Sequence, residues 1–301
     1  MIRTMGILFS SMLFAVCYSL GSIAAESNKS KRIIVANAGF MTPESIEYYA
    51  AEDVYLVSNL NGDGLTADGN GFISKVHPDG RIIKLKWLDG TTKGVSLNSP
   101  KGLAIQGNNL YVADINEVHI FDLPSGKQKT SINISNSTFL NGITPGTGDF
   151  VYVTDSGLKA GKDSLAASGT DAIYKVLANG KYELLYKNKQ MGHPNGIIAQ
   201  GKRLTVVTFG SGEVFSIDAH GKRHNLVKPP KGDLDGLIKL ADGRLIMSSW
   251  AGSALYILNK DNSYSILADG LDAPADLGFD SKRQRVLIPL FKQDKLVFLQ
   301  L

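Results

Sequence analysis

A short motif recurs along the chain at nearly fixed intervals: an amide or a carboxylate stands before a glycine, and an apolar residue follows. The motif is LNGI at 140–143, PNGI at 194–197 and LDGL at 234–237. Equivalent segments place six residues in one register: Glu44, Lys101, Asn141, Asn195, Asp235 and Ala275. Successive register positions lie 57, 40, 54, 40 and 40 residues apart. A period near 40 with two longer steps predicts a repeat architecture.

Each repeat shows the alternation of a half-buried β-strand several times. A short apolar segment follows the register position. A β-branched and aromatic segment such as NLYVAD (109–114) comes next, then a third, and a more polar fourth such as YELLYK (182–187). Glycine, Asn-Gly and Asp-Gly stand at turn positions between them, and nothing from Lys31 to Leu301 keeps a helical period. Four antiparallel strands repeated six times predict an all-β fold, a six-bladed β-propeller.

The two ends of the chain are predicted to close the ring. The last repeat has only three strands, ending with KLVFLQ at 295–300, whereas RIIVAN at 32–37 precedes the first repeat and belongs to none. Placing this N-terminal segment as the fourth strand of the last blade leaves no open sheet edge. Two β-sandwiches, the competing fold, would need a linker and a break in the period, and the sequence has neither.

Residues 1–25 are predicted to be a secretory signal peptide, and residues 26–301 the propeller. Arg3 precedes a long apolar run, which small residues follow. We therefore expect a periplasmic or secreted protein. The single cysteine, Cys17, lies in this segment, so the mature chain is predicted to have neither a disulfide nor a sulfur ligand for a metal.

The charge pattern argues against a nucleic-acid partner. The formal net charge is +4, and the basic residues are scattered apart from a short cluster at Lys29, Lys31 and Arg32. No stripe of basic residues interleaved with aromatic residues is present. No later stretch is apolar enough to span a bilayer. We expect a monomer that acts on a small-molecule substrate, with no nucleic acid and no membrane span.

The register position is predicted to lie at the mouth of the central channel, where the first strand of each blade begins. Four side chains at this position carry oxygen atoms on short stems: Glu44, Asn141, Asn195 and Asp235. Each Asn-Gly or Asp-Gly pair is by itself a turn dipeptide. Glu44, however, precedes a serine, so turn chemistry does not explain it. Two carboxylates and two amides suit a hard cation, calcium before magnesium, and suit zinc poorly.

From Lys31 to Leu301 the chain resembles the gluconolactonase and senescence-marker-protein (regucalcin) group of six-bladed propellers. It resembles the paraoxonases and phosphotriesterase propellers more distantly. The resemblance rests on the motifs above, on PESIEYYAAEDVYLVSN (43–59) and on LDGLIKLADGRLIMSSW (234–250). Exported bacterial members of the group share NGDGLTADGNGFISKV (61–76).

This resemblance implies a divalent cation on the axis, usually calcium, and hydrolysis of lactones or related esters. The implied ligands are a Glu, two Asn and an Asp, which fall on Glu44, Asn141, Asn195 and Asp235. Family members often carry Asn-Asp where this chain has Asn141 and Gly142. One ligand or substrate contact of the family is therefore missing here.

Asp235 and His193 are the predicted catalytic residues. Asp235 could contact both the ion and a water molecule, so it is either the general base or only a ligand. His193, two residues before Asn195, either assists catalysis or is a solvated loop histidine. No Gly-x-Ser-x-Gly nucleophile motif is present.

Lys101, Phe209 and Trp250 are predicted to contact substrate. Lys101 holds the register position of the second blade, where it either binds an anionic substrate or extends into solvent. Phe209 and Trp250 end second strands, and they either wall a pocket or pack between blades. The two long steps of the repeat come from 59–71 and 156–170, which both connect a second strand to a third. Both loops are therefore predicted to overhang the register positions.

Two functions remain open from the sequence. The first is a metal-dependent hydrolase of a small lactone or ester. The second is a non-catalytic propeller that binds a ligand or a protein partner, with a structural ion or none, because propellers serve unrelated functions.

Overall fold

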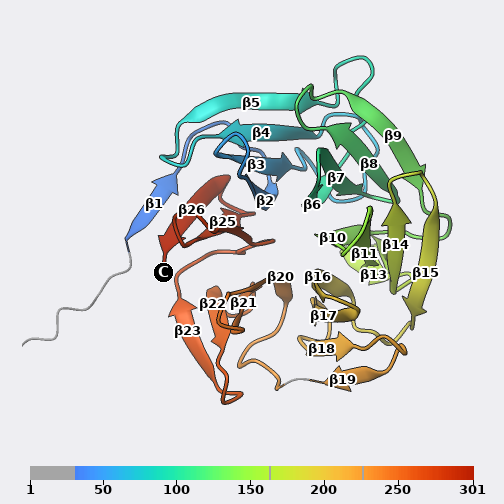
Figure 1. Cartoon of the computed structure of the whole chain (residues 1–301), viewed down its shortest axis with the longest axis vertical. Helices are drawn as coiled ribbons and strands as arrows, with labels where there is room; N and C mark the ends of the chain where they lie inside the picture. Colours follow the sequence, from blue (N-terminus) through green and yellow to red (C-terminus); the bar gives the residue numbers. More distant parts are fainter. Residues whose placement is uncertain (1–30, 163, 226) are drawn as a thin grey trace, which may run out of the picture.

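The computed structural model describes residues 31–162, 164–225 and 227–301, so the predicted signal peptide (1–25) lies outside the described residues. The described part is built from strands without a helix, and six four-stranded antiparallel sheets surround a central axis (Figure 1). The predicted six-bladed β-propeller is confirmed. In the described ranges no helix is long and apolar enough to cross a membrane.

The blades follow one another along the chain, and in each the first strand lies nearest the axis (Figure 1). Blade one is β2 (Pro43–Tyr49), β3 (Val54–Asn59), β4 (Phe72–Val76) and β5 (Ile82–Asp89); blade two is β6 (Pro100–Gln106), β7 (Asn109–Asp114), β8 (Glu117–Asp122) and β9 (Gln128–Asn133); blade three is β10 (Leu140–Pro145), β11 (Phe150–Asp155), β14 (Ala172–Leu177) and β15 (Tyr182–Lys187). Blade four is β16 (Pro194–Gln200), β17 (Arg203–Thr208), β18 (Val214–Ile217) and β19 (Arg223–Asn225); blade five is β20 (Leu234–Lys239), β21 (Leu245–Ser249), β22 (Ala254–Leu258) and β23 (Tyr264–Ala268); blade six is β24 (Gly278–Asp280), β25 (Arg285–Leu290), β26 (Lys295–Gln300) and β1 (Arg32–Val35).

The hydrophobic core lies between the blades. Six clusters of buried apolar side chains are present, and each joins two neighbouring blades. Middle strands such as β3 and β22 are buried along their whole length, because each blade is covered on both faces. Outer strands such as β15 are largely exposed, which explains their more polar sequence. The face-to-face stacking of the blades is what holds the inner strands around the axis.

The N-terminal strand closes the last blade, as predicted. β1 pairs antiparallel with β26, and Arg32 lies opposite Leu299. The seam between blades six and one is reinforced by Tyr55, whose ring lies edge-on to that of Phe298 with centroids 4.8 Å apart. The Tyr55 hydroxyl donates to Asp280. The ring is thus closed by strand pairing within blade six and by side chains between blades.

The glycine after the register residue is required by the packing of inner strands. A Cβ on Gly142 would overlap the carbonyl oxygen of Asn195, and one on Gly196 would overlap that of Asp235. The Asn-Gly and Asp-Gly pairs lie within strands β10, β16 and β20. Close approach of neighbouring backbones therefore selects glycine here. These pairs do not form turns.

Candidate functional site

A β-bulge begins the inner strand of each of the first five blades. Leu140 pairs with Asp155, and regular pairing resumes only at Ile143. The same irregularity occurs at the start of β2, β6, β16 and β20. The residues passed over are the register residue and its successor. Because a bulge re-aims side chains, it sets the register residues apart from the regular alternation of each strand.

Four register residues each carry a buried oxygen that has no hydrogen-bond partner among the described residues. These oxygens are Oε2 of Glu44, Oδ1 of Asn141, Oδ1 of Asn195 and Oδ1 of Asp235. The four residues are between 3% and 5% exposed. Buried polar atoms are nearly always paired in native proteins, so four unpaired oxygens at one register indicate a site built for a partner.

The electrostatics of the site favour a positive partner. Burial raises the pKa of Glu44 well above its usual range, and the charges of Asp235 and Asp276 raise it further, while Lys101 opposes them. Burial also raises the pKa of Asp235 well above its usual range, and Asp276 adds to this. The Trp250 indole N–H and the Asn195 amide lie beside Asp235 and lower its pKa, although neither forms a hydrogen bond of good geometry to it. Carboxylates that destabilise one another in this way need protons or a cation.

The donor set fits a hard cation. In the described ranges no group of three or more His, Cys, Asp or Glu residues is placed to hold a metal. Of the four register residues, only Glu44 and Asp235 belong to these residue types. Asn141 and Asn195 contribute two amide oxygens in addition. Oxygen-only donors of this kind suit calcium, which accepts carboxylates, amide carbonyls and water in flexible geometry.

The Asn141 amide is oriented by Ser156. Asn141 Nδ2 donates to Ser156 Oγ at 3.2 Å, and that hydroxyl donates to the Pro194 carbonyl oxygen at 2.7 Å. Because the nitrogen of the amide is occupied, its oxygen is the unpaired atom. Ser156 thus ties the register residue of blade three to the start of the inner strand of blade four.

Lys101 is buried, so the alternative that it extends into solvent is wrong. Only 1% of the residue is exposed. Its Nζ donates to the carbonyl oxygens of Gly64 at 2.8 Å and Ser99 at 3.1 Å, and lies 4.4 Å from the centre of the Phe139 ring. Burial lowers its pKa, whereas Asp114 and then Glu44 raise it. The sequence did not show this burial because it depends on a long-range contact: Gly64, which accepts from Lys101, belongs to a loop of the preceding blade.

His193 is anchored rather than freely solvated. Its side chain is 25% exposed, and Nδ1 lies 2.8 Å from the carbonyl oxygen of Ser156. A carbonyl oxygen only accepts, so Nδ1 carries the proton and Nε2 is left as an acceptor. The backbone N–H of His193 donates to Asp171 Oδ2 at 2.9 Å. Since the Ser156 hydroxyl also accepts from Asn141 Nδ2, Ser156 holds both His193 and the register residue of blade three.

Phe209 and Trp250 pack against one another at the mouth. Their ring centroids are 5.3 Å apart in an edge-to-face arrangement. Phe291, which sequence reasoning missed, extends the contact at 5.0 Å from Trp250. The influence of the Trp250 indole N–H on Asp235 places this ring beside the candidate ligands.

Both long loops are on the mouth face, as predicted. Residues 60–71 connect β3 to β4, and residues 156–171 connect β11 to β14 with a small hairpin, β12 (Leu158–Ala160) and β13 (Leu165–Ala167). The first loop lies against the entrance of blade two through Gly64 and Lys101. In the second loop, Ser168 bonds to Thr138 beside the entrance of blade three.

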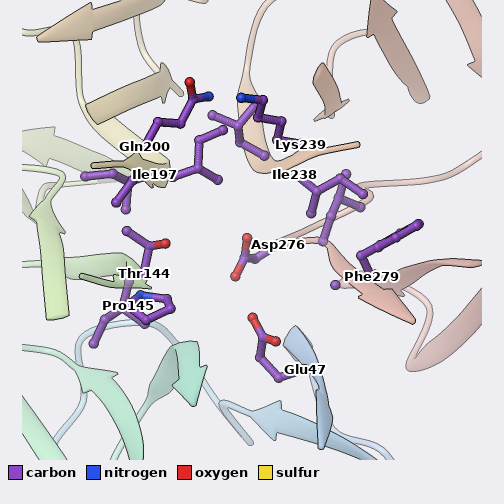
Figure 2. A pocket seen from close by; sticks show the side chains of 15 residues that line it. Glu47, Thr144, Pro145, Ile197, Gln200, Ile238, Lys239, Asp276 and Phe279 are labelled. Carbon is purple, nitrogen blue, oxygen red and sulfur yellow. The ribbon is translucent and has the colours of Figure 1, made fainter. Parts of the chain in front are cut away.

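The far end of the axis holds a separate cavity of about 320 Å³, shown in Figure 2. Apolar residues of the inner strands line most of it, and the carboxylates of Glu47 and Asp276 point toward one another inside it (Figure 2). Burial, followed by the charge of Asp276, raises the pKa of Glu47 to about 8. Asp276 occupies the place that glycine holds in blades two to five and Ser45 holds in blade one, and Ser45 Oγ donates to it at 2.7 Å. This carboxylate lies between the cavity and the register residues.

Comparison with solved structures shows several enzymes with the same fold. A gluconolactonase from Xanthomonas campestris gives a TM-score of 0.71 at 16% identity, over 91% of this chain and 90% of that chain. A virginiamycin B lyase from Staphylococcus aureus gives 0.62 at 15% identity, over 90% and 99%, and a streptogramin B lyase gives 0.61 at 13%, over 90% and 96%. Neither a family model nor a curated protein sequence matches. The likeness to gluconolactonase propellers therefore holds for the fold.

Proposed function

We propose that this protein is a calcium-dependent hydrolase of a small lactone or ester. The observation that carries the proposal is the set of four unpaired buried oxygens on Glu44, Asn141, Asn195 and Asp235. Structures of the same fold include a gluconolactonase, which supports a small cyclic ester as the substrate class. We further propose that the chain is exported, as its first 25 residues predict, and acts as a monomer.

A bound divalent cation would polarise the substrate carbonyl oxygen and so favour attack by water. Asp235 is the proposed general base, because its Oδ1 is unpaired while the Asn195 amide and the Trp250 indole N–H lie beside the carboxylate and lower its pKa. His193 offers Nε2 as a second acceptor, with its ring fixed by Ser156. The chain's own contribution is to orient a water molecule, accept its proton and keep the carbonyl in place.

The second candidate, a non-catalytic ligand-binding propeller, is favoured by two residues. Lys101 fills the register position of blade two with an ammonium group whose two hydrogen bonds go to protein carbonyls. Gly142 provides no carboxylate where related sequences often carry one. Both features reduce the number of groups available to a substrate, but neither supplies a partner for the four unpaired oxygens.

A panel of chromogenic lactones and esters, assayed with calcium and with a chelator, tests the hydrolase proposal. Turnover that is lost with the chelator and restored by calcium is expected. No turnover on any lactone or ester would favour the binding module, whereas turnover that is unaffected by the chelator would refute the calcium dependence. Glu183→Gln, at an exposed ion pair of the outer strand β15, is the matched control for substitutions of the acidic ligands.

A further inference from the structure

One residue per blade forms a second ring at the mouth, directly after the second strand. The residue before the register position lies opposite the last residue of that strand in all six blades, as Pro194 does with Thr208 and Pro274 with Leu290. The next residue along the chain therefore stands beside the register position. These six residues, here called the mouth ring, are Leu60, Ile115, Ser156, Phe209, Trp250 and Phe291.

Backbone hydrogen bonds repeat around the mouth ring. The N–H of Trp250 donates to the carbonyl oxygen of Asp233 at 3.0 Å, which is two residues before the register residue Asp235. Leu60, Ser156, Phe209 and Phe291 each make the equivalent bond in their own blades. The same backbone bond thus recurs in five of the six blades, so differences in the character of the mouth arise from the side chains.

The aromatic members occupy one half of the mouth ring. Phe209, Trp250 and Phe291 come from the consecutive blades four, five and six, and successive centroids lie 5.3 Å and 5.0 Å apart. All three are partly exposed. Lys292 places its ammonium group 5.3 Å from the centre of the Trp250 ring. We call these three rings the aromatic arc.

The aromatic arc is the half of the mouth without a long loop. The loops at 60–71 and 156–171 lie against the entrances of blades two and three. In blades four to six, by contrast, the connection from the second strand to the third strand has only four or five residues. A substrate that approaches the four register residues therefore meets aromatic rings on the open side.

The chemistry of the aromatic arc selects apolar groups. Among its three side chains only the Trp250 indole N–H can form a hydrogen bond, and this group lies beside Asp235. Hydroxyl groups of a sugar placed against the rings would lose water without gaining partners, which is costly. Flat apolar groups bury area on the rings and pack edge-on or offset. The positive charge of Lys292, beside the Trp250 ring, would repel a cationic substituent packed on these rings.

We infer that the substrate carries an aromatic or other flat apolar group, neutral or anionic, which packs on Phe209, Trp250 and Phe291 while its ester carbonyl faces the register residues. This inference rests on the proposed function for the position of the carbonyl. The arc itself is defined without reference to any reaction. A polyhydroxylated sugar lactone is therefore expected to be a poor ligand.

The test uses lactams, which replace the lactone by an amide that resists hydrolysis, so that binding is measured apart from turnover. The chain has two tryptophans, and Trp87→Phe leaves Trp250 as the only fluorescent indole. In this background the lactam analogue of dihydrocoumarin should quench Trp250 and bind at least about tenfold more tightly than gluconolactam.

Phe291→Ala and the milder Phe291→Leu should each weaken binding of the aromatic lactam. Phe150→Ala removes a partly buried ring from the start of β11, away from the mouth, and should leave affinity unchanged. Equal affinity for both lactams, no binding of either, or no effect of the Phe291 variants would overturn the inference. Tight aromatic binding without turnover of any lactone would retain the arc and reject the hydrolase. Turnover without preference for aromatic substrates would retain the hydrolase and reject the aromatic arc as a substrate-binding surface.

Discussion

Glu44 and Asp235 are the second residues of the inner strands of blades one and five, and each has one buried carboxylate oxygen that lacks a hydrogen-bond partner among the described residues. They are 191 residues apart in the sequence, yet the charge of Asp235 raises the pKa of Glu44. None of the ion pairs among the described residues involves either carboxylate. The ring of blades thus brings together two acids that the fold alone does not neutralise.

Without an ion, the protein should become less stable as the pH rises. Burial raises the pKa of Asp276 to about 6, and burial together with Asp276 raises that of Glu47 to about 8. A raised acid pKa means that the folded state keeps protons that the unfolded chain releases. The free energy of unfolding should therefore be greatest near pH 4 and fall as the pH rises to about 8. Acids with a lowered pKa, such as Asp218 at about 2, stop changing the stability by about pH 5, where the same carboxyl is ionised in the unfolded chain too.

Thermal melts of chelator-treated protein across this pH range measure the effect. Glu47→Gln cannot ionise and should flatten the decline, whereas Glu183→Gln, whose side chain is 55% exposed, should not. Calcium should also reduce the decline, because it would bind the ionised carboxylates of Glu44 and Asp235, whose pKa values are raised as well. A melting temperature that rises steadily from about pH 4 to about pH 8 without the ion would contradict the raised pKa values.

Gly142→Ala and Gly196→Ala should each destabilise the fold. The added methyl group would overlap a carbonyl oxygen of the neighbouring inner strand, which is backbone and cannot move away without shifting the blade. A loss of about 2 kcal/mol or more in the free energy of unfolding is expected from urea titration. Gly62→Ala, in an exposed loop where the nearest atom is 3.9 Å away, is the control and should change it little. Equal effects at Gly62 and Gly142 would refute the packing explanation.

Lys101→Met should loosen the loop at 60–71. The substitution removes the hydrogen bonds to Gly64 and Ser99, and each buried carbonyl left without a partner costs about 1–3 kcal/mol. Cleavage within the loop by a nonspecific protease, followed by mass spectrometry, should be faster than in the parent protein. Lys84→Met, on the exposed face of β5, provides the comparison. Unchanged cleavage in the Lys101 variant would show that other contacts hold the loop.

His193→Gln should slow hydrolysis if the proposed function holds. General acid–base assistance contributes roughly a hundredfold to ten-thousandfold to rate, so kcat should fall within that range while KM changes little. His220→Gln, in the exposed turn between β18 and β19, is the matched control and should retain activity. Full activity of the His193 variant would leave Asp235 as the sole candidate base.

The sequence contained enough periodicity to predict the six blades, the closing strand and the positions of both long loops. The four candidate ligands could be found because each stands at one register of the repeat. Asp276 was missed because it replaces the glycine rather than the register residue, where blade six has Ala275. Phe291 was missed although it follows Trp250 by the same 41 residues that separate Trp250 from Phe209.

Other features depend on contacts that no local pattern records. The burial of Lys101 requires the carbonyl oxygen of Gly64, 37 residues earlier, to fold over it. The anchoring of His193 requires the carbonyl oxygen of Ser156 in the neighbouring blade. In both cases the sequence shows the type of side chain. It does not show the contacts of that side chain, because they come from a loop of the neighbouring blade.

Isothermal titration of the chelator-treated protein with calcium tests the central claim most directly. One ion per chain is expected to bind, with Glu44→Gln and Asp235→Asn each abolishing or greatly weakening the binding and Glu183→Gln leaving it intact. Binding that survives both substitutions, or no binding of calcium or magnesium to the parent protein, would contradict the claim that the four unpaired oxygens form a cation site.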